Sequence, residues 1–203
     1  MQKMIKYMVM AAILMLGPHM AQAEDMPASK LIGQEIYHFD KSHTNIMWFV
    51  SHIGFSKSMG QFMDYDGQII LDHANPALSS VNITFKTASV MTGLPKFDDH
   101  LRTADFFDVE KYPTASFISR KVTLLEGNGA AVEGDFTLLG VTKPLTLKVR
   151  LNKRAMDIPK NIMRTGFSAK TTFKRSLWGM EKYLPFIGDE VTIRIEAEAL
   201  KTQ

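Results

Sequence analysis

Apolar and polar residues alternate along most of this chain, and the pattern is clearest near its end. Over residues 191–199, valine, isoleucine and alanine hold every odd position, and threonine, arginine and glutamate hold every even one. A period of two is typical of a β-strand with one apolar and one polar face. Repeated around a closed sheet, this pattern predicts a barrel with an apolar interior.

Similar segments follow one another, separated by short stretches rich in glycine, proline and asparagine. We predict strands over 44–53, 60–71, 81–86, 114–125, 131–139, 145–152, 163–173 and 191–200. Short turns join antiparallel neighbours, and about eight strands make a barrel wide enough for one small ligand. The expected fold class is therefore all-β: an eight-stranded antiparallel, lipocalin-like barrel.

One segment departs from the strand pattern. Gly93-Leu94-Pro95 interrupts it, and we expect a short helical excursion near residues 97–107 that ends by Pro113. Such an insertion is expected to cap one end of the barrel, with Phe106 and Phe107 packed inward.

The first 23 residues have the features of a secretory signal peptide. Lys3 and Lys6 precede an apolar run over 7–16, and Ala21-Gln22-Ala23 matches a small-x-small cleavage site. The run of about ten residues is shorter than the roughly 20 that span a membrane. We therefore predict cleavage after Ala23, a single mature domain over 24–203, and a periplasmic location.

Composition narrows the class of protein further. The chain of 203 residues has a formal charge of +3 and no cysteine, so it can form no disulfide. No basic run alternates with aromatic residues, which argues against a nucleic-acid partner. Outward strand positions such as Lys148, Arg150 and Glu196 are charged, whereas the lipid-facing band of an outer-membrane barrel is apolar. We expect a monomer or dimer without stable membrane insertion.

Four blocks of sequence, in a fixed order, carry a family resemblance. They lie within 43–54, 99–113, 134–144 and 173–191; the first reads HTNIMWFVSHIG and the third GDFTLLGVTKP. These blocks resemble the YceI-like family of lipocalin-like periplasmic proteins, also called polyisoprenoid-binding proteins. The resemblance implies an elongated antiparallel barrel that holds a long isoprenoid or similar amphiphile. Thr44, Trp48 and Leu139 depart from the family pattern.

The predicted partner is a polyisoprenoid, an isoprenoid quinone or another long-chain lipid. Each buried methylene contributes about 0.8 kcal/mol of transfer free energy, so a long chain needs few polar contacts. Strand parity, or a place in the aromatic-rich stretch near a barrel mouth, selects the candidate ligand-binding residues: Ile46, Trp48, Val50, His52, Ile83, Phe85, Phe117, Phe136, Leu147, Phe167, Arg175, Trp178 and Ile193.

Two polar candidates leave alternatives open. If its face looks inward, His52 either makes a structural hydrogen bond to backbone or a neighbouring strand, or anchors a ligand head group. Arg175 either holds an anionic or quinone-like head group or pairs with Asp99 or Asp189 as a structural clamp. We favour the structural role for both residues.

Catalytic and metal-binding patterns are weak. No H-E-x-x-H occurs, and the histidines beyond the leader lack close ligand spacing. The segments 54–58 and 166–170 fail the G-x-S-x-G pattern at its last position. We therefore predict a carrier with no catalytic residue, metal or cofactor. The alternative is an enzyme that acts on a lipid or quinone bound in the same barrel.

Overall fold

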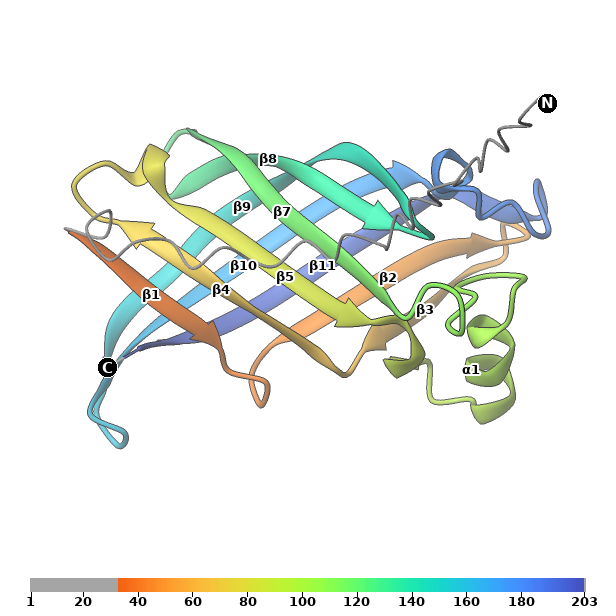
Figure 1. Ribbon diagram of the computed structural model, residues 1–203, viewed down its shortest axis with the longest axis horizontal. Helices are drawn as coiled ribbons and strands as arrows, with labels where there is room; N and C mark the ends of the chain where they lie inside the picture. The colour runs from red at the N-terminus through yellow and green to blue at the C-terminus, as the bar shows by residue number, and fades with distance from the viewer. Residues whose placement is uncertain (1–32, 203) are drawn as a thin grey trace, which may run out of the picture. The chain divides into compact units, whose positions relative to one another are not determined.

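Eight rows of antiparallel strands close into a barrel in the computed structural model, which describes residues 33–202 (Figure 1). The expected signal peptide over 1–23 lies outside the described residues. The strands are β1 (Gln34–Phe39), β2 (Asn45–His52), β3 (Ser56–Phe62), β4 (Tyr65–Asp72), β5 (Ser80–Lys86), β6 (Val90–Met91), β7 (Thr114–Leu124), β8 (Gly129–Leu138), β9 (Val141–Asp157), β10 (Ile162–Lys174) and β11 (Ile187–Lys201).

A row is one strand position around the barrel, and three of the eight rows are each occupied by two successive strands. β1 and β2 share one row, β3 and β4 the next, and β5 and β6 the third; β7 to β11 fill one row each. The predicted eight-stranded antiparallel barrel is therefore confirmed.

The barrel closes along β11, which changes its partner part-way. Its residues 187–196 pair with β2, and its residues 199–201 pair with β1. Between these stretches, Thr44 Oγ1 donates a hydrogen bond to the Glu198 carbonyl and accepts one from the Glu198 amide, each 3.0 Å long. The Asp40 amide also donates to that carbonyl, at 2.8 Å. The side chain of Thr44 thus fills the gap in the ladder.

The predicted strands differ from the observed ones in detail. The stretch 60–71, expected as one strand, is the end of β3 followed by β4, and the gap left at 54–59 between two predicted strands holds most of the turn 53–55 and the start of β3. The buried aromatic of β3 is the even-numbered Phe62, whereas that of β4 is the odd-numbered Tyr65. The two residues between the strands, 63 and 64, change the parity, so that the buried aromatic side chain of each strand faces the barrel interior. β1 was not predicted at all, because apolar and polar residues do not alternate regularly in its sequence QEIYHF; its one fully buried residue is Tyr37.

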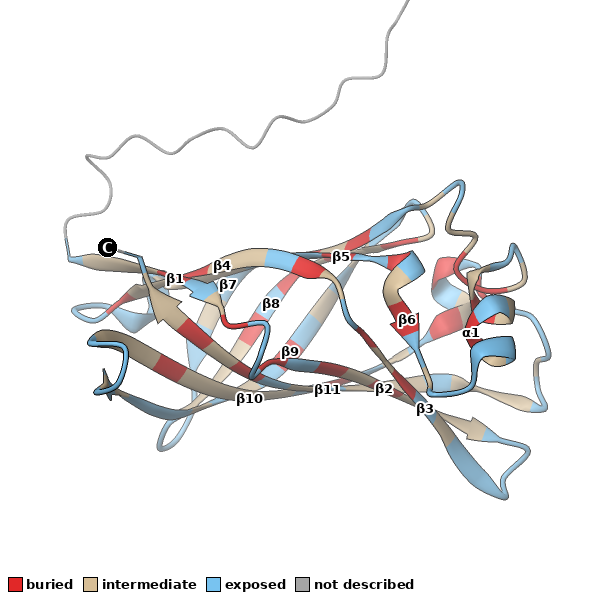
Figure 2. Ribbon diagram, turned by 90° about the horizontal axis from the view of Figure 1, so that it is seen from below, coloured by how far each residue is buried: buried red, intermediate tan, exposed pale blue. Residues whose placement is uncertain are grey.

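The expected helical excursion is α1 (Pro95–Arg102), which lies with the loop 103–113 at one end of the barrel (Figures 1 and 2). Asp98 is buried in α1 and accepts hydrogen bonds from the amide and hydroxyl of Thr92, at 2.7 and 2.6 Å. Arg102 donates to the Val90 carbonyl at 3.1 Å. Phe106 and Phe107 are buried, as predicted. These contacts fix α1 to the wall.

Large aromatic rings lie against glycines on the neighbouring strand. Trp48 of β2 pairs with Gly60 of β3, where an added Cβ would lie 2.5 Å from the indole ring. Phe117 of β7 lies against Gly134 of β8, where a Cβ would again be 2.5 Å from the ring. A side chain at either glycine would push the aromatic ring off the barrel wall.

Candidate ligand cavity

Two apolar cavities occupy the interior of the barrel. The mouth cavity, of about 590 Å³, lies at the α1 end, and the barrel cavity, of about 420 Å³, lies among the inward faces of the strands. Phe136 and Ile193 line both cavities. These two side chains therefore lie between the two spaces, at a position here called the waist.

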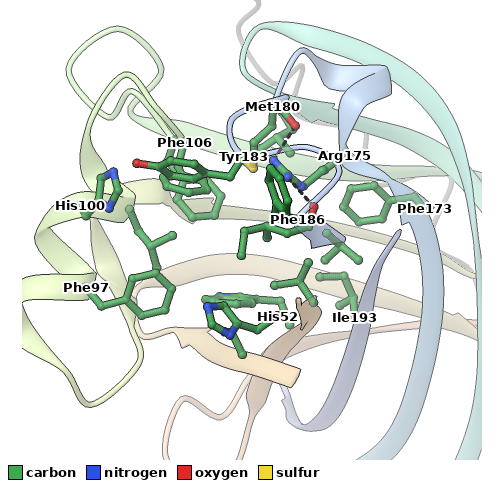
Figure 3. A pocket seen from close by; sticks show the side chains of 18 of the residues that line it. His52, Phe97, His100, Phe106, Phe173, Arg175, Met180, Tyr183, Phe186 and Ile193 are labelled. Atoms are coloured by element: carbon green, nitrogen blue, oxygen red, sulfur yellow. Dashed lines mark hydrogen bonds between the residues drawn. The ribbon is translucent and has the colours of Figure 1, made fainter. Parts of the chain in front are cut away.

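The mouth cavity is bounded by three parts of the fold (Figure 3). Phe173 and Ile193 come from the barrel wall, and Phe97 and Phe106 come from α1 and the loop that follows it. The third part is the loop 179–186, which contributes Met180, Tyr183 and Phe186. A cavity with aromatic walls on several sides suits an apolar guest.

Among residues 33–202, no ionisable side chain lines the barrel cavity. Its polar side chains belong to Thr44, Ser79, Ser80, Asn128 and Thr171. Of the two cavities, the mouth cavity is the one that described ionisable residues line: His52, His100, Arg175 and Tyr183. Both cavities are thus mainly apolar, and the ionisable groups of the described lining are gathered at the mouth.

Strand parity placed most of the predicted ligand-binding residues on the cavity walls. The barrel cavity is lined by Ile46, Ile83, Phe85, Phe117, Leu147 and Phe167. The mouth cavity is lined by Trp48, Val50, His52 and Arg175, and Phe136 and Ile193 line both.

Trp178 is not part of either lining. It lies in the 3-10 helix η4 (Arg175–Trp178) and is 2% exposed. Its ring packs on Phe136 and Phe173, with centroids 5.5 and 4.9 Å apart, and its Nε1 donates to the Phe136 carbonyl at 3.2 Å. Trp178 therefore packs against Phe136 at the waist without lining either cavity.

His52 lines the mouth cavity but is exposed, because β2 ends at this residue. Strand parity predicts an inward side chain for His52. Because β2 ends there, the side chain lies at the rim of the cavity and not in the interior. The structural hydrogen bond expected for a buried His52 side chain is not formed with any described residue.

Arg175 is a structural clamp, but its partners are carbonyl groups. The side chain is 2% exposed, and burial lowers the pKa of its guanidinium below the ordinary value. Nε donates to Gly188 O at 2.9 Å, Nη1 to Met180 O at 2.8 Å, and Nη2 to Lys182 O and Ile187 O at 2.8 and 3.1 Å. These bonds hold the loop 179–186 against the start of β11.

The expected partners of Arg175 are engaged elsewhere. Asp189 accepts hydrogen bonds from the Ser176 amide and hydroxyl, both at 2.9 Å. Asp99 pairs with Arg102 at 2.9 Å. A guanidinium has five N–H donors, and the carbonyls use four of those on Arg175, so one N–H on Nη1 has no partner among the described residues.

Comparison with known proteins identifies the family to which this barrel belongs. The chain matches the YceI-like domain over residues 37–199. It belongs to the YceI-like family. A UPF0312 protein of Pseudomonas putida strain W619 is 40% identical over 147 residues, which cover 71% of this chain and 76% of the relative.

Two solved structures are similar to this YceI-like chain. The YceI protein of Campylobacter jejuni has a TM-score of 0.69 and 28% identity, covering 75% of this chain and 90% of the other. A polyisoprenoid-binding domain from Saccharophagus degradans has a TM-score of 0.62 and 14% identity, covering 82% and 98%. Among the residues that the structure describes, no helix is long and apolar enough to span a bilayer.

Sequence reasoning missed the loop residues of this YceI-like cavity. Phe97, His100, Tyr183 and Phe186 lie outside the strands, where no period of two marks an inward face. Their only signal was a high density of aromatic residues near the predicted barrel mouth.

An ionic bridge joins the two loops of the mouth. Asp105 accepts a hydrogen bond from His100 Nε2 at 3.1 Å and pairs with Lys182 Nζ at 3.0 Å. These bonds from His100 and Lys182 lower the pKa of the Asp105 carboxyl. The loop 103–113 is thereby connected to the loop 179–186.

Three potential metal ligands lie together outside the cavities. Their ligand atoms, from Asp40, His43 and Glu198, are within 4.8 Å of one another. Arg164 Nη1 already donates to both carboxylates, at 2.8 Å to Asp40. The guanidinium supplies the positive charge in this cluster, which ties the β1–β2 turn to β10 and β11.

Proposed function

We propose that this protein is a periplasmic carrier that binds one long-chain amphiphile along the two joined cavities. The observation that carries the proposal is the distribution of ionisable groups: among the described lining residues, ionisable side chains line the mouth cavity and none lines the barrel cavity beyond the waist. A molecule with one polar end and a long hydrocarbon tail matches this arrangement.

The tail supplies most of the binding free energy in this proposal. Each methylene that leaves water contributes about 0.8 kcal/mol. The tail enters past Phe136 and Ile193 and lies between the inward side chains of β5, β7, β8 and β9. Specificity then depends mainly on how far the tail extends and on the width of the waist.

The head group stays in the mouth cavity. Arg175 has one N–H that no described residue accepts, and His52 and Tyr183 line the same space. Their chemistry suits a head group that accepts hydrogen bonds, such as a phosphate, an amide or a quinone carbonyl. The four carbonyls around Arg175 hold its guanidinium in place before a ligand arrives.

Two further observations support the class of ligand and the location. The Saccharophagus degradans neighbour is described as a polyisoprenoid-binding domain, which favours an isoprenoid chain. The signal-peptide features of residues 1–23 favour the periplasm. We propose binding without turnover, because no hydrogen bond among the described residues joins Ser58 of the mouth cavity to a histidine.

Adjacent residues of β8 provide a direct test. Ala130 lines the barrel cavity, whereas Ala131 is on the opposite face of the strand. Ala130→Phe should fill the far part of the cavity and weaken binding of geranylgeraniol by about tenfold or more, while binding of the shorter geraniol changes little. Titration by tryptophan fluorescence measures both affinities.

The matched control is Ala131→Phe, which adds the same ring outside the barrel and should bind both alcohols as the wild type does. Equal affinities of Ala130→Phe and wild type for geranylgeraniol would contradict the proposed path of the tail. Mass spectrometry of lipids extracted from the purified mature protein identifies the natural ligand.

A further inference from the structure

The rim of the mouth cavity is made of exposed apolar side chains. Ile53, Leu94, Tyr183 and Phe186 line the cavity and are nevertheless 51%, 64%, 46% and 68% exposed. Phe55, at the β2–β3 turn, is 89% exposed. These five residues, here called the apolar rim, come from three separate segments that meet at one opening.

We propose that the apolar rim docks the protein on an anionic bilayer surface, so that the ligand passes between membrane and mouth cavity without crossing water. This inference rests on the proposed function, because only a membrane-resident ligand makes such a contact useful. Aromatic side chains with an apolar body favour the membrane interface. The rim contains three of them.

Lysines accompany each segment of the rim. Lys57 follows Phe55 by two residues, Lys96 follows Leu94 by two, and Lys182 precedes Tyr183. Lys57 and Lys96 form no ion pair with any described residue, whereas Lys182 is paired with Asp105 at 3.0 Å and its Nζ lies 5.3 Å from the centroid of the Tyr183 ring. Of the other acidic neighbours, Asp99 is paired with Arg102, whereas Glu181 forms no ion pair with any described residue. Lysine beside exposed aromatic residues complements anionic lipid head groups.

The barrel cavity reaches the surface at a second place with different chemistry. Its exposed lining residues there include Leu124, the last residue of β7, and Leu125 of the β7–β8 turn, followed by Glu126. No aromatic residue or lysine lies within two positions of either leucine. Charge and side-chain type therefore favour the apolar rim as the face toward the membrane.

The test compares two exposed turns with the same spacing of residues. Phe55→Asp with Lys57→Glu changes the rim, and neither residue lines a cavity. Ile158→Asp with Lys160→Glu substitutes the same residue types in the β9–β10 turn, where Ile158 is 85% exposed and Lys160 Nζ lies 3.8 Å from Asp40. Co-sedimentation with vesicles of phosphatidylethanolamine and phosphatidylglycerol measures docking, and circular dichroism checks the fold.

We expect the wild type and the Ile158/Lys160 variant to bind these vesicles equally. The Phe55/Lys57 variant should bind at least about tenfold more weakly, yet bind geranylgeraniol added from ethanol as the wild type does. Equal vesicle binding by all three proteins, or none by the wild type, would overturn docking while leaving the carrier proposal intact. A wild type that does not bind geranylgeraniol would instead overturn the carrier proposal.

Discussion

Arg175 shows how a single residue can order a cavity wall. It is a buried cation without a carboxylate partner among the described residues, and four carbonyl oxygens from the loop 179–186 and β11 surround it. Charge-assisted hydrogen bonds of this kind are stronger than neutral ones. The loop that carries Tyr183 and Phe186 is therefore positioned by Arg175.

Replacing Arg175 by methionine should destabilise the folded protein. The four carbonyls would lose their donor while remaining largely desolvated, at a cost of at least about 3 kcal/mol in the free energy of unfolding. Ser176→Ala, one residue away, loses only the hydroxyl bond to Asp189 and should cost about 1 kcal/mol. Urea unfolding compares the two variants. A stable Arg175→Met protein that merely binds ligand less well would show that Arg175 is an anchor and not a clamp.

At the scale of elements, the seam between β1 and β2 depends on Thr44. This buried hydroxyl both donates to and accepts from the backbone of Glu198 where β11 changes partner. Thr44→Val keeps the shape and removes both hydrogen bonds, so we expect a loss of about 1–3 kcal/mol in the free energy of unfolding. Faster hydrogen exchange at the Glu198 amide should accompany the loss. Thr44→Ser retains the hydroxyl and should preserve most of the protection.

The elements that were predicted correctly are those whose pattern is continuous. The alternation over 191–199 gave both the strand and the inward face of Ile193, because burial on one face of a sheet imposes a period of two. The split of 60–71 was missed because the parity changes between Phe62 and Tyr65. A parity rule has no information about where a strand stops.

Because parity gives no information about strand ends and loops, some predictions for the candidate site failed. His52 has the correct parity but lies at the end of β2, so it is exposed at the rim. The carbonyl partners of Arg175 could not be predicted, because every residue has a carbonyl and sequence does not distinguish them. Trp178 was selected for its place near a mouth, whereas its ring packs behind Phe136. The positions of loops that depend on tertiary contacts can be seen only in the three-dimensional structure.

At the scale of the whole molecule, ion pairs hold the seam of the barrel together. Burial alone would raise the pKa of Asp40, but hydrogen bonds from His43, Arg164 and the Ser42 amide lower it to about 2. Burial would also raise the pKa of Glu35, and hydrogen bonds from Lys201 and other donors lower it well below its usual range. Both carboxylates are therefore more acidic in the folded chain than in the unfolded one.

Lower pKa values in the folded state make the stability of the barrel depend on pH in a definite direction. The contribution of Asp40 is present above its unfolded pKa of 3.8 and is lost as the pH falls toward 2. This contribution is roughly 2 kcal/mol, since one pKa unit corresponds to about 1.4 kcal/mol. Asp40→Asn should therefore lower the free energy of unfolding at neutral pH by about that amount. Urea unfolding at a series of pH values should show the variant and wild-type curves converging in acid, and parallel curves would exclude Asp40 as a source of acid sensitivity.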